Sequence, residues 1–137
     1  MLRSLDISDY MNRRPAKVYA DDGLFSAIDI ITDNHLSGVC VVDQDEKLVG
    51  VLSEMDCLRA VVTATYNNSA GVGQVRDFMT HEVITCNLHD NLVDVASDMI
   101  AKGHRRRPVL DNGRLIGQIS CRQVLRVVSI FNRRRKN

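Results

Sequence analysis

Residues 37–61 read SGVCVVDQDEKLVGVLSEMDCLRAV, and residues 104–128 read HRRRPVLDNGRLIGQISCRQVLRVV. Both stretches contain an apolar run, a polar turn, a second apolar run around a glycine, a serine, and then the polar start of a helical pattern. This order is typical of a β-hairpin followed by a helix. Because it occurs twice in register, we expect two copies of one structural unit.

The repeat extends beyond these two stretches. Upstream, Asp9-Tyr10-Met11 returns as Asp77-Phe78-Met79 at an offset of 68 residues. Downstream, Leu58-Arg59 returns as Leu125-Arg126 at an offset of 67, after a one-residue deletion in the turn. The copies therefore span roughly residues 9–62 and 77–128.

Each copy shows the same order of predicted elements. Apolar residues at helical spacing follow Asp22 and Asp90, which we expect to be helix N-caps. Short apolar runs at 16–19 and 83–86 predict the first strands. The resulting order of strand, helix, hairpin and helix predicts an α/β (α+β) fold of two tandem repeats. Since about 50 residues cannot easily cover their own sheet, we expect the repeats to pack sheet to sheet with pseudo-twofold symmetry.

The repeat also sets the expected domain limits. We assign residues 1–66 to the first repeat with its N-terminal segment, and residues 77–137 to the second with a basic C-terminal tail. The small and polar segment NNSAGVG indicates a linker, which we place at 67–76. At 137 residues and 45% hydrophobic composition, the two repeats together have the size of one ordinary domain.

Charge is unevenly distributed along the chain. The net charge is +1, but residues 1–103 hold 8 basic and 16 acidic side chains, whereas residues 104–137 hold 10 basic residues against Asp111 alone. This asymmetry suggests an anionic partner: a phosphate ligand, nucleic acid, a membrane surface or the acidic part of the same protein. The tail at 132–136 lacks interleaved aromatic residues, so we do not expect nucleic-acid binding.

Several classes of protein are disfavoured by what the sequence lacks. It has no apolar signal region and no stretch of about 20 apolar residues, so we expect a cytoplasmic protein without a membrane span. The four histidines and four cysteines show no metal-ligand spacing. Neither a G-x-S-x-G elbow nor a Walker A loop is present, so we expect no enzymatic activity.

The duplicated pattern resembles the cystathionine-beta-synthase (CBS) domain pair, or Bateman module, over nearly the whole chain. The resemblance implies a stand-alone regulatory module that senses an adenosine-containing ligand, such as AMP, ADP, ATP or S-adenosylmethionine, in the cleft between the repeats. It also implies a homodimer and a regulated partner protein, with the adenine nucleotide as a regulatory ligand and no required cofactor. The alternative is a constitutive dimerisation or protein-interaction scaffold that binds no nucleotide.

The motif Gly50-Val51-Leu52-Ser53-Glu54-Met55-Asp56 fits a ligand site in two ways. A serine and the first amides of a helix suit an anion, and a carboxylate one turn later can accept from two ribose hydroxyls. The resemblance implies these roles for Ser53 and Asp56. From the residues alone, a capping box between Ser53 and Asp56 is the competing interpretation, and the two roles can coexist.

The second copy departs from this motif because it keeps Ser120 but carries Gln123 where the acidic residue belongs. A glutamine can hydrogen-bond to a diol, but it lacks the charge that strengthens the hydrogen bonds of a carboxylate. We therefore expect the site with Asp56 to be the better ribonucleotide site. The resemblance implies phosphate contacts for the forked side chains of Arg105 and Arg106. The alternative for these arginines is a solvated basic edge that pairs with the acidic first copy.

The first strands complete the predicted site. The resemblance implies that Lys17 and Val18, like Val83 and Ile84, supply backbone and apolar contacts to the adenine base. Ordinary strand packing is the alternative for all four residues.

Overall fold

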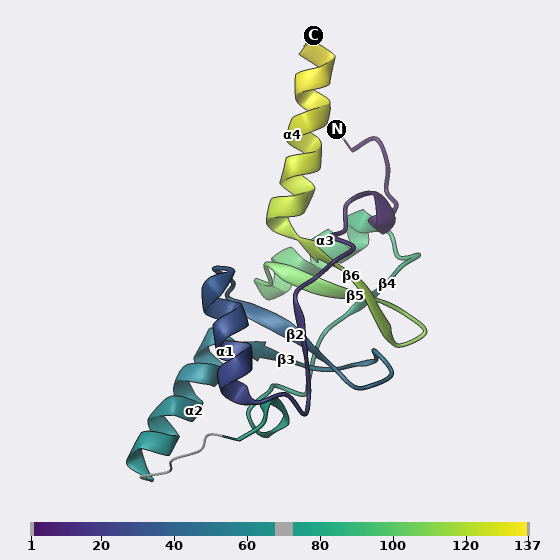
Figure 1. The fold of residues 1–137 in the computed structure, drawn as a ribbon. Coiled ribbons are helices and arrows are strands. Elements are labelled where there is room, and N and C mark those ends of the chain that lie inside the picture. Colours follow the sequence, from purple (N-terminus) through teal and green to yellow (C-terminus); the bar gives the residue numbers. More distant parts are fainter. Residues whose placement is uncertain (1, 68–72, 137) are drawn as a thin grey trace. The chain divides into compact units, whose positions relative to one another are not determined.

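A computed structural model describes residues 2–67 and 73–136, which form an α/β protein with four α-helices and two three-stranded sheets (Figure 1). The chain divides into two compact units. Residues 16–83 form one, called here the central unit, and residues 1–15 together with 84–137 form the other, called the terminal unit. The α/β class and the repeated order of elements predicted from the sequence are confirmed.

The central unit contains β1 (Lys17–Tyr19), α1 (Leu24–Asp33), β2 (Gly38–Val42), β3 (Leu48–Ser53), α2 (Glu54–Tyr66) and the 3-10 turn η2 (Val75–Asp77). Its sheet has the order β1-β2-β3, with β1 parallel and β3 antiparallel to β2. Val18 lies opposite Val41, which in turn lies opposite Gly50. The buried side chains of the sheet pack with those of α1 and α2 into one hydrophobic core.

The terminal unit repeats this arrangement with the 3-10 turn η1 (Ile7–Asp9), β4 (Cys86–Asn87), α3 (Leu92–Lys102), β5 (Arg106–Asp111), β6 (Arg114–Ser120) and α4 (Cys121–Lys136). Its sheet order is β4-β5-β6, again parallel and then antiparallel. The predicted tight turn between its hairpin strands is confirmed, because Asn112 and Gly113 both have positive φ angles, of 52° and 82°.

The N-terminal ends of α1 and α3 differ from the prediction. The N-cap residues are Gly23 and Asn91, and the Asn91 side chain accepts from the amides of Val93 and Asp94. The two expected caps close the preceding turn instead: a carboxylate oxygen of Asp22 accepts from the Tyr19 amide, and one of Asp90 accepts from the Asn87 amide. An aspartate bonded backwards to the strand end cannot also cap the helix ahead of it.

The first strand of the second repeat is also shorter and later than predicted. Only Cys86 and Asn87 pair with β5, opposite Val109 and Leu110. Val83 and Ile84 precede this strand, and Ile84 is 44% exposed. The prediction of a strand at 83–86 was therefore wrong for residues 83–85.

In each unit, one glycine of the hairpin allows another segment of the chain to cross the hairpin at short distance. A Cβ atom on Gly50 would lie 2.7 Å from the Thr80 carbonyl oxygen and 2.9 Å from the Met79 sulfur. In the terminal unit, a Cβ atom on Gly117 would lie 2.9 Å from the carbonyl oxygen of Asn12. Such distances leave no room for a side chain, so the central glycine of the repeated motif is required by this crossing.

Candidate functional site

Ser53 and Asp56 form a capping box where β3 passes into α2. The Ser53 hydroxyl oxygen accepts from the Asp56 amide at 3.0 Å, and the Asp56 Oδ2 atom accepts from the Ser53 amide at 3.0 Å. Both bonds satisfy amides at the helix start that have no partner within the helix. The capping interpretation is thus confirmed, and it fixes the carboxylate of Asp56 beside the first turn of α2.

The second carboxylate oxygen of Asp56 is held less firmly. Asp56 is 7% exposed, yet its Oδ1 atom accepts only at long range, from Arg59 Nη1 at 3.3 Å and Thr80 Oγ1 at 3.5 Å. Hydrogen bonds weaken steeply at such distances. Since the Arg59 side chain is 69% exposed, its guanidinium can swing away. One oxygen of this carboxylate is therefore available to a stronger donor.

Thr80 is a member of this cluster that the sequence reasoning missed. Its backbone pairs with Val51, with N–H to O distances of 3.0 and 2.8 Å, and this places its hydroxyl 3.3 Å from Asp56 Oδ2. The crossing over Gly50 brings a residue 24 positions away in sequence to the carboxylate. The sequence feature that could have indicated it is the tripeptide Asp77-Phe78-Met79, the counterpart of Asp9-Tyr10-Met11, because Thr80 follows it directly.

The terminal unit has a corresponding cluster without the charge. Ser120 caps α4 by accepting from the Gln123 amide at 3.1 Å. Asn12, at the position equivalent to Thr80, pairs with Gln118 through backbone bonds of 2.8 and 2.9 Å. Gln123 thus occupies the place of Asp56 in the repeat. The carboxylate that we expect to bind a ribose is therefore found in the central unit and has no counterpart at Gln123.

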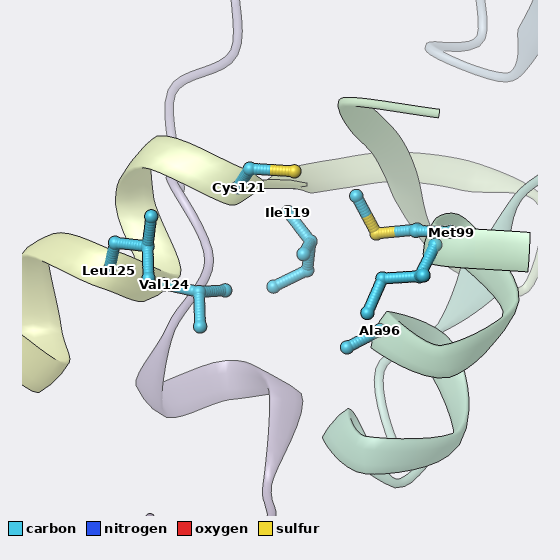
Figure 2. A pocket seen from close by; sticks show the side chains of 7 residues that line it. Ala96, Met99, Ile119, Cys121, Val124 and Leu125 are labelled. Carbon is cyan, nitrogen blue, oxygen red and sulfur yellow. The ribbon is translucent and has the colours of Figure 1, made fainter. Parts of the chain in front are cut away.

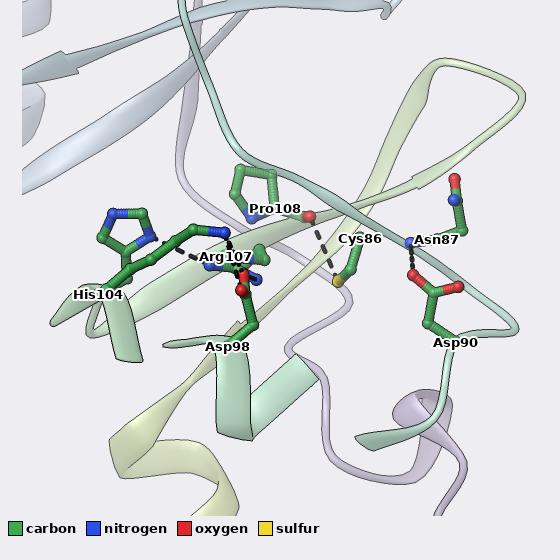
Figure 3. A network of polar contacts seen from close by, with 8 residues as sticks. Cys86, Asn87, Asp90, Asp98, His104, Arg107 and Pro108 are labelled. Carbon is green, nitrogen blue, oxygen red and sulfur yellow. Dashed lines mark hydrogen bonds and ion pairs between the residues drawn. The ribbon is translucent and has the colours of Figure 1, made fainter. Parts of the chain in front are cut away.

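The three arginines at the start of the second hairpin have different environments. Arg105 and Arg106 are exposed, and Arg106 lies opposite Ser120 across the hairpin. Arg107 is 3% exposed: its Nη1 atom lies 2.6 Å from an Asp98 oxygen, and its Nη2 atom lies 3.1 Å from Nδ1 of His104 (Figure 3). Two of the arginines are therefore accessible to an anion, and the third joins β5 to α3.

The four predicted base-contacting residues have mixed environments. Val18 is 1% exposed and belongs to the core, whereas the Lys17 ammonium pairs with Glu46 in the turn before β3, away from Ser53 at the strand's far end. The same carboxylate accepts from the Tyr19 hydroxyl, and this hydrogen bond raises the pKa of Tyr19. Val83 is half-buried, and Ile84 is more exposed.

The predicted residues fall into two sets. Lys17, Val18, Ser53, Asp56 and Val83 belong to the central unit, and Ile84, Arg105, Arg106 and Ser120 belong to the terminal unit. Within the sets, the structure brings Ser53 to Asp56 and Arg106 to Ser120. Their joint action on one ligand stays a prediction.

Two cavities lie in the terminal unit, and the sequence reasoning predicted neither. One, of about 260 Å³, is apolar and lies between α3 and α4, with Met99, Ile119, Val124 and Leu125 in its lining (Figure 2). The other, of about 240 Å³, is bordered by Asp90, Asp94, Asp98 and Arg107. Among residues 2–67 and 73–136, no group of three or more histidine, cysteine or acidic side chains is placed to hold a metal ion.

Among the residues that the structure describes, no disulfide joins the cysteines, and three of them are buried. Burial raises the pKa of Cys57, and it raises that of Cys86 to about 11. Cys40 is the third buried thiol, whereas Cys121 is exposed at the start of α4. These environments make the buried thiols poor nucleophiles at neutral pH.

The sequence matches the CBS domain family twice, over residues 7–63 and 75–130. The chain belongs to the CBS domain family. The two matches contain the Gly50–Asp56 and Gly117–Gln123 motifs described above, so this CBS pair is one in which only the first motif carries an acidic residue. The family assignment made from the sequence is confirmed.

Other proteins resemble this pair in sequence or in fold. Uncharacterized protein MJ1225 of Methanocaldococcus jannaschii is 28% identical over 102 residues, which are 74% of this chain but only 35% of that protein. The crystal structure of CBSX2 in complex with AMP has a TM-score of 0.81 at 25% identity, covering 94% of this chain and 99% of the other. The CBS domain pair of MJ0100, in complex with 5′-methylthioadenosine and S-adenosyl-L-methionine, has a TM-score of 0.70 at 22% identity, covering 90% and 95%.

One further property concerns membranes. In the part of the chain that the structure describes, none of the helices combines the length and the apolar character that crossing a bilayer demands.

Proposed function

We propose that this CBS pair is a regulatory module that binds an adenosine-containing ligand, with Asp56 holding the ribose. The observation that carries the proposal is the state of the Asp56 carboxylate. It is 7% exposed, one oxygen is fixed by the capping box at 3.0 Å, and the other has only contacts of 3.3 and 3.5 Å. A buried carboxylate that is oriented but incompletely bonded is suited to accept from a sugar hydroxyl.

Neighbouring groups add to this chemistry in the central unit. The Ser53 hydroxyl uses its oxygen for the cap, so its own proton can be donated to an anionic oxygen of the ligand. We assign contacts with the base to the strand backbone at Lys17 and Val18, and to Val83. These assignments follow the resemblance of the Gly50–Asp56 motif to that of the family.

In the terminal unit we assign phosphate contact to Arg105, Arg106 and Ser120, and an apolar base contact to Ile84. Both arginines are exposed, and forked guanidinium groups suit phosphate oxygens. With Gln123 in place of an acidic residue, this unit should bind a ribose more weakly than the central unit. Repeat limits of 1–66 and 77–137 remain part of the proposal, and residues 68–72 of the proposed 67–76 linker lie outside the described residues.

The ligand class is supported by two proteins of the same fold. CBSX2 was crystallised with AMP, and the MJ0100 pair with S-adenosyl-L-methionine and 5′-methylthioadenosine. Adenosine is the part that these ligands share. We therefore propose AMP, ADP, ATP or S-adenosylmethionine as a regulatory ligand, without turnover, and a partner protein that responds to the bound state.

A second function, as a homodimer or interaction scaffold, is favoured by apolar side chains exposed on α2. Met55, Leu58 and Tyr66 are 63%, 58% and 87% exposed. Exposed apolar groups that gather on one helix commonly mark a protein interface. We propose that the chain forms a homodimer through its helices, whether or not ligand is bound.

Titration calorimetry with AMP, ADP, ATP and S-adenosylmethionine tests the ligand proposal. We expect at least one of them to bind the wild type, and its affinity to fall by at least about tenfold in Asp56→Asn, which keeps the shape of the side chain without its charge. Asp45→Asn, in the exposed turn before β3, is the matched control and should bind normally. If none of the four ligands gives heat of binding with the wild type, the ligand proposal fails and only the scaffold function remains.

A further inference from the structure

We propose that the polar cavity of about 240 Å³ in the terminal unit is a second ligand site, which takes a small molecule carrying a protonated amine and an oxygen acceptor. Asp90 and Asp94 hold the amine, and Arg107 donates to the oxygen. The cavity is bordered by residues of β4, α3 and β5, all of which belong to the terminal unit. None of its lining residues is one to which we assign a nucleotide contact, so the inference does not rest on the proposed function.

The cavity lies on the face of the sheet opposite to the exposed Arg106. Arg106 and Arg107 are consecutive residues of β5, and successive side chains of a strand point to opposite faces. Arg107 is 3% exposed and lines the cavity together with residues of α3. A ligand in this cavity is therefore separated by the sheet from a phosphate group bound at Arg106.

The terminal unit is charged here, where the central unit is apolar. At an offset of 68 residues, the counterparts of Asp98 and Arg107 are Ile30 and Val39. Val39 belongs to the core of the central unit, and Ile30 packs against it. The fold of the repeat therefore does not require charges at these positions. Because a buried ion pair costs desolvation energy that apolar side chains avoid, the pair of Asp98 and Arg107 indicates a role beyond folding.

The guanidinium group of Arg107 is incompletely satisfied. Its Nη1 atom lies 2.6 Å from Asp98, and its Nη2 atom lies 3.1 Å from His104 (Figure 3). The third nitrogen, Nε, is buried and has no hydrogen-bond partner among the residues that the structure describes. A buried N–H group without an acceptor is unfavourable. Since Arg107 lines the cavity, an oxygen atom of a ligand bound there supplies the acceptor that Nε lacks.

Three aspartates line the same cavity. Asp94 and Asp98 are four residues apart on α3, so they lie on one side of the helix, where like charges repel. Asp94 is exposed, and no residue of the described chain donates a hydrogen bond to its carboxylate. Asp90 accepts from the Asn87 amide at 2.8 Å through one oxygen. Asp90 and Asp94 therefore both have carboxylate oxygens available to a donor.

The balance of charge selects the ligand. The charge of Asp98 is offset by ion pairs with Arg107 and Lys102, at 2.6 and 2.8 Å. Asp90 and Asp94 remain as two negative charges beside an N–H group that lacks an acceptor. Carboxylates attract a protonated amine through charge-assisted hydrogen bonds, whereas a purely anionic ligand is repelled. Basic amino acids and amino alcohols combine the required amine with an oxygen acceptor.

The remaining walls of the cavity are uncharged. They are formed by Thr85, Cys86, Asn91 and Val95. Burial raises the pKa of Cys86 to about 11, so its thiol adds no negative charge at neutral pH. The side-chain oxygen of Asn91 is used to cap α3. Recognition of the ligand therefore depends on the aspartates and on Arg107.

Titration calorimetry and amide NMR spectra of the full chain test the site. L-lysine, L-arginine and ethanolamine carry both groups, n-butylamine carries an amine without an oxygen, and succinate carries oxygens without an amine. We expect at least one of the first three to bind, and n-butylamine and succinate to bind at least about fivefold more weakly. The amide signals that shift should belong to residues 85–98 and to Arg107, which border the cavity.

Asp94→Asn tests the contact with the amine. It removes one charge at an exposed position, so the fold should tolerate the change. We expect the affinity for the bound amine to fall at least about fivefold, because a neutral amide gives up the charge-assisted hydrogen bond. Asp111→Asn, at the exposed end of β5, makes the same change outside the cavity and should bind normally.

A double variant tests the buried pair. Asp98→Ile with Arg107→Val gives the terminal unit the side chains that Ile30 and Val39 supply in the central unit. We expect this variant to remain folded by circular dichroism, since an apolar pair avoids the desolvation cost of an ion pair, and to lose binding of the amine.

Several results would overturn the proposal. They are the absence of binding by all three ligands that carry both groups, equal affinity for n-butylamine, and unchanged affinity in Asp94→Asn or in the folded double variant. Shifts of amide signals confined to residues outside the cavity would do the same. Nucleotide binding is measured in a separate titration, so its failure and the failure of this site are distinguishable.

Discussion

Asp56 and Ser53 each satisfy the other's backbone amide, with both hydrogen bonds at 3.0 Å. This reciprocal pair begins α2 and at the same time orients the carboxylate to which we assign ribose binding. Structure and proposed function therefore depend on the same two side chains, and their contributions can be separated experimentally.

Removal of the cap should cost stability. Ser53→Ala deletes the oxygen that accepts from the Asp56 amide, so we expect the free energy of unfolding in urea to fall by about 0.5–2 kcal/mol. Ser120→Ala removes the corresponding cap of α4, which accepts at 3.1 Å, and should cost a similar amount. An unchanged stability for Ser53→Ala would mean that the capping box contributes nothing.

Gly50→Ala should disturb the crossing segment. The new Cβ would lie 2.7 Å from the Thr80 carbonyl oxygen, so the segment at 79–80 must move and its contact with Asp56 should be lost. We expect a lower urea midpoint together with weaker ligand binding by calorimetry. Gly23→Ala is the control, since a Cβ there meets nothing within 4 Å, and it should leave binding intact.

Acid should weaken the Asp98 contact. Hydrogen bonds from Lys102 and then from Arg107 lower the pKa of Asp98 below 3.8 in the folded state. Its contribution to stability is therefore present above pH 3.8 and is lost as the pH falls through the lowered pKa. Urea midpoints of wild type and Asp98→Asn should differ at pH 7 and converge in strong acid.

The control for this experiment is Asp94→Asn, an exposed position on the same helix. It should follow the wild type across the pH range. A constant gap between Asp98→Asn and wild type from pH 7 to below pH 3 would contradict the assignment to ionisation of Asp98.

Thiol reactivity should distinguish Cys121 from the other cysteines. A chromogenic disulfide at pH 8 and low protein concentration should label one thiol per native chain quickly, because three of the four cysteines are buried. The pKa of Cys86, about 11, leaves little of the reactive thiolate at that pH. Cys121→Ser should abolish the fast phase, and persistence of that phase would show that a buried thiol is accessible.

The elements were predictable where local pattern decides the structure. Periodicity of apolar residues marked the helices and hairpins, and Asn112-Gly113 marked a turn because both residues adopt positive φ. The helix starts were predicted one residue too early, since Asp22 and Asp90 bond back to the preceding strand ends rather than forward.

Contacts between distant segments were not predictable in this way. Thr80 reaches Asp56 only because its segment crosses Gly50, and no local propensity reports such a crossing. Similarly, nothing in a run of three arginines tells which one will be buried. Arg107 is the one that turns inward because Asp98 and His104 offer it partners on the same side of β5.

The central claim is that Asp56 binds the ribose diol, and calorimetry with AMP and its 2′,3′-dideoxy analogue tests it most directly. The account predicts that the wild type prefers AMP by about tenfold or more, and that Asp56→Asn largely loses this preference. An equal preference in both proteins would contradict the account, because the diol would then be recognised by some other group.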